Sequence, residues 1–152
     1  MKNKIVHHLL IVSSLFIAAI VSAEESPAGV CTIELSGIRV NQGGNIIVAL
    51  YSGEENWLKR DKTYAVKTIE VTSNIATVNF DGVVYNREYA LFVYHDRNDN
   101  KKLDFRGFPF PKPNEGIAVS NNAVRWGKPF YDKASFTIGS QAVKQSIPMH
   151  YY

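Results

Sequence analysis

The sequence predicts an all-β protein, a single antiparallel β-sandwich of about seven strands with one long ordered loop. Three observations support this fold class. Apolar and polar residues alternate with period two along most of the chain, no helical period of useful length follows the N-terminal segment, and short turn sequences separate the alternating stretches. Period-two alternation gives a strand one apolar face. Short strands with short connections are typical of a sandwich.

The first two expected strands supply the clearest pattern. The stretch "CTIELSGIRV" begins at Cys31 and alternates apolar with polar residues, so Cys31 is expected on the inner, buried face. The turn residues "NQGGN" follow and predict a hairpin. Residues 46–52, "IIVALYS", are almost continuously apolar, which predicts a central strand covered on both faces. Because Cys31 is the single cysteine, the core holds no internal disulfide.

Five further strands complete the predicted count. "AVKTIEV" and "IATVNF" are separated by the turn residues Ser73 and Asn74. The longest strand runs from Glu88 to His95, and the last two are "KASFTI" and the C-terminal "AVKQSIPMHYY". The intervening segment 96–128 shows no convincing strand. It is stiffened by three prolines and carries aromatic residues that can pack, and long ordered loops are commonly functional.

A candidate calcium site opens that loop in "HDRNDNKKLD". Calcium takes six to eight oxygen ligands, which loops supply from alternating positions. The pattern departs from helical calcium loops at Lys101, where those loops place glycine, and at Gly107, where they place glutamate. The alternative is a turn whose side chains cap their own backbone. The expected ligands are the side chains of Asp96, Asn98, Asn100, Asp104 and Glu115 and the carbonyl of Lys102.

Aromatic residues suggest a second kind of site, a stacking surface for a saccharide or a peptide. Cores and long loops also use aromatic side chains without any ligand, so packing remains the alternative. The candidate ligand-binding residues are Trp57, Phe108, Phe110, Trp126 and Tyr131.

Catalysis is the reading that the sequence favours least. His95, Asp96 and Ser120 are the residue types of a hydrolytic triad, but neighbouring residues on a strand point to opposite faces. No zinc spacing, phosphate-binding glycine loop or nucleophile elbow appears.

The N-terminus predicts export. Lys2 and Lys4 precede an apolar run from Leu9 to Val21, and a small residue, Ala23, follows, as in a cleaved signal peptide. The expected division is a signal peptide at 1–23 and one domain at 24–152, periplasmic or extracellular and without a membrane span after cleavage. That domain keeps 15 basic against 14 acidic residues, a balance that gives no electrostatic basis for binding nucleic acid.

The chain resembles a known family at the loop and beyond it. "HDRNDNKKLD", then "PNEG", "VSNNA", "ASFTI" and the final tyrosines, resemble the secreted bacterial domain-of-unknown-function family 2141. That resemblance implies a secreted β-sandwich with no assigned activity. The family usually has a glycine within the acidic segment, where this chain has Asp99 and Lys101.

A second, more general similarity concerns the fold. "VNFDGVVYNREYALFVYHD" is similar to a strand–turn–strand of transthyretin-like and collagen-adhesin B-type domains. Transthyretin-like hydrolases use a particular C-terminal tetrapeptide, which "MHYY" does not match.

These observations favour an exported, non-catalytic module stabilised by a calcium ion. A carbohydrate- or peptide-binding module is the alternative, and a hydrolase of a small substrate is the second alternative. The expected partner is a saccharide, a peptide or a protein.

Overall fold

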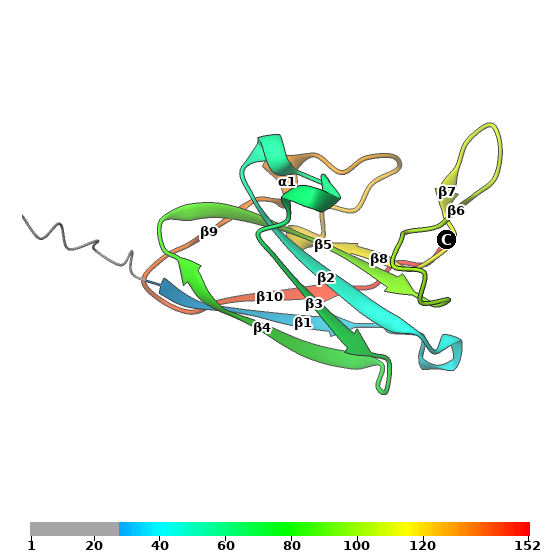
Figure 1. The fold of residues 1–152 in the computed structure, drawn as a ribbon, viewed down its shortest axis with the longest axis horizontal. Helices are drawn as coiled ribbons and strands as arrows, with labels where there is room; N and C mark the ends of the chain where they lie inside the picture. Colours follow the sequence, from blue (N-terminus) through cyan, green and yellow to red (C-terminus); the bar gives the residue numbers. More distant parts are fainter. Residues whose placement is uncertain (1–27) are drawn as a thin grey trace, which may run out of the picture.

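A computed structural model describes residues 28–152 as a mostly β structure with several separate sheets and no barrel (Figure 1). The expected signal peptide and its cleavage site lie outside the described residues. The strands are β1 (Ala28–Ser36), β2 (Asn45–Ser52), β3 (Ala65–Glu70), β4 (Ile75–Val84), β5 (Arg87–Asp96), β6 (Phe105–Arg106), β7 (Lys112–Pro113), β8 (Ile117–Val119), β9 (Phe136–Ile138) and β10 (Val143–Pro148). The helices, each three or four residues long, are η1 (Val40–Gln42), η2 (Glu54–Asn56), η3 (Arg60–Lys62), η4 (Ser120–Asn122) and α1 (Tyr131–Ala134).

The larger sheet has the order β3-β2-β5-β8, with β9 also paired to β5. Its two central strands are apolar on both faces. In β2, Ile46, Val48 and Leu50 alternate with residues of the other face that are also buried. Those residues, Ile47 and Ala49 among them, lie opposite the outward-facing side chains of β5. The continuous apolar run of β2 therefore reflects two buried faces, as predicted.

The smaller sheet has the order β10-β1-β4. β1 pairs with β4 in the antiparallel direction and with β10 in the parallel direction. The prediction that all strands pair antiparallel is therefore wrong. Parallel neighbours need a long connection. The alternation of a strand indicates its faces and not the direction of its partner, so sequence reasoning had no signal for this pairing.

The predicted hairpin between the first two strands does not form. β1 and β2 lie in different sheets, and the segment between them crosses from one sheet to the other. In that segment the Ile38 N–H donates to the carbonyl of Asn74, and the Arg39 N–H donates to the hydroxyl of Tyr151. Turn residues reverse the chain equally well within a sheet and between sheets, which is why "NQGGN" was misleading.

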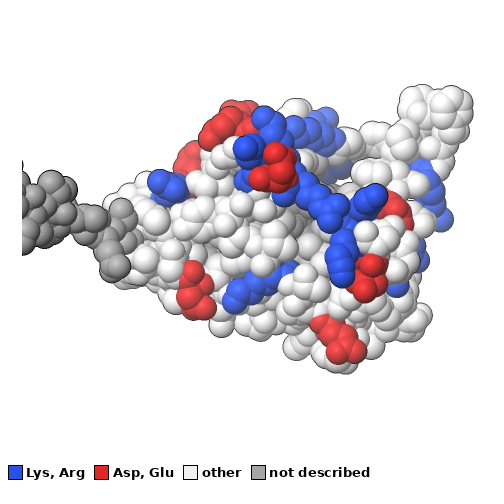
Figure 2. Space-filling view, viewed as in Figure 1, with Lys and Arg blue, Asp and Glu red and all other residues white. Residues whose placement is uncertain are grey.

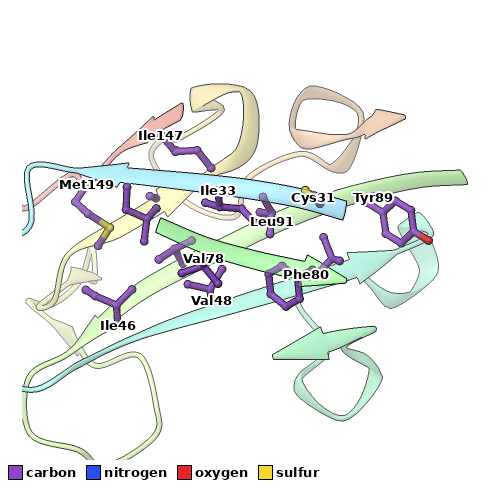
Figure 3. Packing of buried hydrophobic residues seen from close by; sticks show 14 of the residues in the cluster. Cys31, Ile33, Ile46, Val48, Val78, Phe80, Tyr89, Leu91, Ile147 and Met149 are labelled. Carbon is purple, nitrogen blue, oxygen red and sulfur yellow. The ribbon is translucent and has the colours of Figure 1, made fainter. Parts of the chain in front are cut away.

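Side chains of both sheets form one hydrophobic cluster (Figure 3). Cys31 and Ile33 from β1, Val78 and Phe80 from β4 and Leu91 from β5 all belong to it. Cys31 is fully buried, which confirms its predicted inward register.

Segment 96–128 contains three short strands, although none was predicted there. β8 joins the larger sheet beside β5, with Ile117 opposite Tyr94. β6 and β7 form a separate two-stranded hairpin that projects from the body at the upper right of Figure 1. Strands of two or three residues are too short to show a period. Within residues 28–152, no helix has the length and apolar character needed to cross a membrane.

Thiol labelling tests the register of β1. Burial raises the pKa of the Cys31 thiol to about 11, so the thiol is both protonated and inaccessible in the native state. We expect Cys31 to react with a thiol reagent only at the rate of unfolding at neutral pH, and rapidly in denaturant. Rapid labelling of native protein would contradict this register.

Candidate functional site

The structure brings the residues of the expected calcium site together in the loop after β5. Asp96 is fully buried, and its carboxylate accepts two hydrogen bonds from the loop backbone. Oδ1 accepts from the N–H of Asn100 at 3.1 Å, and Oδ2 accepts from the N–H of Lys101 at 2.7 Å. Asp96 thus ties the loop to the end of a core strand.

Glu115 returns to the same loop from the residues before β8. Its side chain is 2 % exposed. Oε1 accepts from the N–H of Arg97 at 3.0 Å, and Oε2 accepts from the N–H of Asp104 at 3.1 Å. The Asp104 carboxylate in turn accepts from the side-chain amides of Asn98 at 2.9 Å and Asn100 at 3.0 Å.

Most side-chain oxygens of the loop accept hydrogen bonds from backbone N–H groups. Asn98 Oδ1 accepts from the N–H of Asn100, and Asn100 Oδ1 accepts from the N–H of Lys102. Lys102 thus contacts the cluster through its N–H, whereas the predicted ligand was its carbonyl. Lys101 has a φ of 62°, the left-handed conformation for which calcium loops use glycine at this position. Across residues 28–152, no three His, Cys, Asp or Glu side chains lie close enough together to hold a metal ion.

A buried histidine lies beside this loop, and from the sequence it was considered only as a member of a triad. His95 Nε2 lies 2.6 Å from the carbonyl oxygen of Gly43 and therefore carries the proton. Nδ1 lies 2.8 Å from the hydroxyl of Tyr151, and this hydroxyl accepts from the Arg39 N–H. The Tyr151 ring lies so close to Gly116 that any Cβ there would overlap it. His95 thus has a structural role and holds the C-terminal segment in place.

The triad geometry is absent from the described residues. Ser120 is fully buried, and its hydroxyl donates to the carbonyl of Ala134 at 2.6 Å and accepts from the N–H of Leu91 at 2.8 Å. The Ser120 hydroxyl is therefore hydrogen-bonded to backbone groups, whereas His95 is hydrogen-bonded to Gly43 and Tyr151.

A groove of about 720 Å³ lies on the outer face of the larger sheet. Its floor is the second apolar face of the central strands. One wall comes from the residues after η2, another from the loop and hairpin between Lys101 and Pro113, and a third from residues 125–129. The floor consists of Ile47, Ala49 and Tyr51 from β2, Phe92 and Tyr94 from β5 and Ile117 from β8.

The predicted aromatic residues fall into two groups. Trp126 is 59 % exposed and lines the groove, and Phe108 and Phe110 are exposed on the hairpin. Trp57 and Tyr131 are buried instead, so the five residues do not form one stacking surface.

Trp57 and Tyr131 pack beside the groove, on the same face of the larger sheet. The Trp57 ring makes edge-to-face contacts with Tyr51 at 5.2 Å, Phe92 at 6.4 Å and Tyr131 at 5.9 Å between ring centroids. Its Nε1 donates to the carbonyl of Pro129 at 2.8 Å. One buried side chain thereby fixes two rings of the floor and one residue of the wall.

The charges along the groove are all of one sign among the residues that line it. No aspartate or glutamate side chain lines the groove, but six basic side chains do. The six are Arg60, Lys101, Lys102, Lys112, Arg125 and Lys128. Figure 2 shows Lys and Arg from the middle of the molecule towards the hairpin, with Asp and Glu side chains among them.

Comparison with known proteins gives one match. The family model described as "Uncharacterized protein conserved in bacteria (DUF2141)" matches residues 33–146. The chain belongs to this family. No curated protein and no solved structure matches it, so the similarity to transthyretin-like domains is not confirmed.

The DUF2141 match covers the loop and most of the groove, from β2 to residue 129. Sequence reasoning found the loop because its polar side chains are conspicuous. It missed the groove because an apolar run such as β2 is normally covered on both faces. The available signal was the pairing of that run with many basic residues in the loop.

Asp96 offers a stability test in this DUF2141 member. The Asp96 carboxylate accepts from the part-buried N–H groups of Asn100 and Lys101, and in Asp96→Asn one of these N–H groups faces the amide NH₂ and loses its acceptor. We therefore expect the free energy of unfolding to fall by about 1–3 kcal/mol. Denaturant unfolding in the presence of a chelator measures it. The control Asp99→Asn changes a side chain that is 58 % exposed and should stay within about 0.5 kcal/mol of wild type. Equal losses in both variants would contradict the role of Asp96.

Proposed function

We propose that this protein is an exported, non-catalytic module that binds a small molecule with an extended apolar body in the groove. In this proposal its two main sheets pack as a β-sandwich. The shared hydrophobic cluster supports that arrangement. The observation that carries the functional proposal is the groove itself, a hollow of about 720 Å³ over the apolar face of the sheet that does not pack against the smaller sheet.

A hollow of this size with an apolar floor fits a ligand site. Ligand pockets in proteins commonly measure about 300–1,000 Å³ and combine apolar walls with a few polar groups. The groove has both properties, since its floor is aliphatic and aromatic and its polar groups lie at the rim.

The rigidity of the floor also supports binding. Tyr51 and Phe92 are held by the Trp57 ring, and both come from the central strands of the larger sheet. A site that is already formed before the ligand arrives loses less conformational entropy on binding.

The groove supports an apolar ligand better than a saccharide or a peptide. The sequence-based alternative relied on stacking by five aromatic residues, and Trp57 and Tyr131 are buried. The floor of the groove has the aliphatic side chains Ile47, Ala49 and Ile117 beside its rings, in positions less accessible than that of Trp126.

We propose in addition that a calcium ion stabilises the 96–104 loop. The hydrogen bonds that connect Asp96, Asn98, Asn100, Asp104 and Glu115 within one loop support this proposal. Asp104 is the ligand best able to turn to an ion, because its carboxylate accepts from side-chain amides and the other two carboxylates cap the backbone. Lys101, Lys102 and Leu103 line the groove, so an ion here would also order one of its walls.

Export remains part of the proposal and is supported by the basic, apolar and small-residue pattern at 1–23. Extracellular and periplasmic fluids contain calcium at levels that fill weak sites.

Thermal unfolding tests the calcium proposal. A ligand that binds only the folded state stabilises it by about 2.7 kcal/mol at a hundredfold excess over its dissociation constant. We expect calcium to raise the melting temperature relative to chelator, Asp104→Asn to abolish the rise and Asp99→Asn to keep it. A wild-type melting temperature that does not respond to calcium would rule the ion out.

A neutral fluorescent probe, N-phenyl-1-naphthylamine, tests the groove. We expect saturable enhancement of its fluorescence, and we expect Thr68→Trp to weaken binding about tenfold because the new ring fills the groove beside Ile47.

The matched control is Thr77→Trp, which adds the same ring at an exposed position of β4 in the smaller sheet. Its affinity for the probe should equal that of wild type. If wild type does not bind the probe, or if both variants bind it as wild type does, the groove is not a ligand site.

A further inference from the structure

We propose that the ligand of the groove is an anionic amphiphile, a single molecule with a long apolar chain and a negatively charged head group. This inference rests on the proposed function of the groove and names the chemical class of its ligand. It is carried by the combination of an apolar floor with a rim whose charges are all positive.

The positive rim is a local feature and does not follow from the composition. The chain beyond residue 23 has 15 basic and 14 acidic residues, which nearly cancel. Six of those basic residues line the groove, and no acidic residue does. Such a one-sided distribution creates a positive potential over a low-dielectric floor, where a charge on a ligand interacts more strongly than in water.

Most of these cations have no acidic partner. Of the six, Lys101 alone forms an ion pair within residues 28–152, with Asp99 at 3.4 Å. Both side chains of that pair are more than half exposed, so the pair contributes little. Arg60, Lys102, Lys112, Arg125 and Lys128 remain available to a ligand.

Arg60 marks one place for the head group. Arg60 lines the groove together with the phenol groups of Tyr51 and Tyr94. Burial raises the pKa of the Tyr51 phenol, which therefore stays protonated at neutral pH. Arginine binds carboxylate and phosphate oxygens through two parallel N–H groups, and the phenols can donate further hydrogen bonds.

Arg125 and Lys128 place further positive charge on the wall formed by residues 125–129. The Arg125 guanidinium lies 3.9 Å from the centre of the Phe130 ring, and its Nη1 donates to the carbonyl of Lys128. These contacts fix the arginine at the wall that contains Trp126. An apolar chain on the floor thus has positive charge on more than one wall of the groove.

A bilayer surface is the competing partner. Phe108 is 97 % exposed and Phe110 is 74 % exposed on the projecting hairpin, whose tip carries no charge in Figure 2. That tip lies outside the groove, however, whereas the basic residues line the groove itself. The charge is therefore placed to bind one molecule whose chain lies on the floor.

The experiment compares dodecanoate, dodecanol and dodecylammonium, which share one chain and differ in head-group charge. Each competes with N-phenyl-1-naphthylamine, at concentrations below those at which it forms micelles. We expect dodecanoate to bind wild type about tenfold more tightly than dodecanol, and dodecylammonium to bind most weakly. The preference for dodecanoate should decrease as salt is added, because salt screens the rim charges.

Arg60→Gln should reduce dodecanoate binding several-fold and leave dodecanol binding unchanged. The control Arg87→Gln removes a positive charge at the start of β5, outside the groove, and should change neither.

The outcomes separate the two proposals. If dodecanol binds as tightly as dodecanoate and Thr68→Trp weakens both, the groove is a ligand site but the inference about charge is wrong. If neither molecule displaces the probe, the proposed function fails. If wild type binds phosphatidylglycerol vesicles but no dissolved dodecanoate, the positive surface serves a membrane and the inference is overturned.

Discussion

The central strands of the larger sheet are apolar on both faces, and this constraint determines most of the structure. One face of β2 and β5 packs against the smaller sheet and forms the main core. The other face needs its own cover, which comes from Trp57, Tyr131 and the segment between β8 and β9. These covering residues do not fill all the space above this face, and the groove is the space that remains. Core and candidate site are therefore two sides of the same strands.

The sequence predicted those features that depend on one strand at a time. Alternation placed Cys31 inward, and the continuous run of β2 indicated two apolar faces. It could not show which strands pair, since β1 lies between β4 and β10 and not beside β2. Partner choice depends on how faces of distant segments fit together, and a periodic pattern does not contain that information.

The loop shows the same distinction between local and distant contacts. The acceptors of Asp96, Asn98 and Asn100 were recognisable because their spacing is local. Glu115 could be suggested only as a candidate, because the two turns and the hairpin that bring it back are invisible to pattern analysis. The hydrogen bond between Tyr151 and His95 could not be predicted from the sequence, since an isolated tyrosine near a chain end has many possible partners.

The parallel pairing of β1 with β10 has a consequence for folding. The first and last strands of the described chain are neighbours, and Glu34 lies within hydrogen-bonding distance of Ser146, 112 positions away. Contacts of such long sequence separation give a high contact order, which slows folding because the loop entropy is lost before the contact forms. A chain emerging from the ribosome cannot complete the smaller sheet until its final residues have appeared. Until then β1 lacks its neighbour β10, and the cluster that the two sheets share stays incomplete.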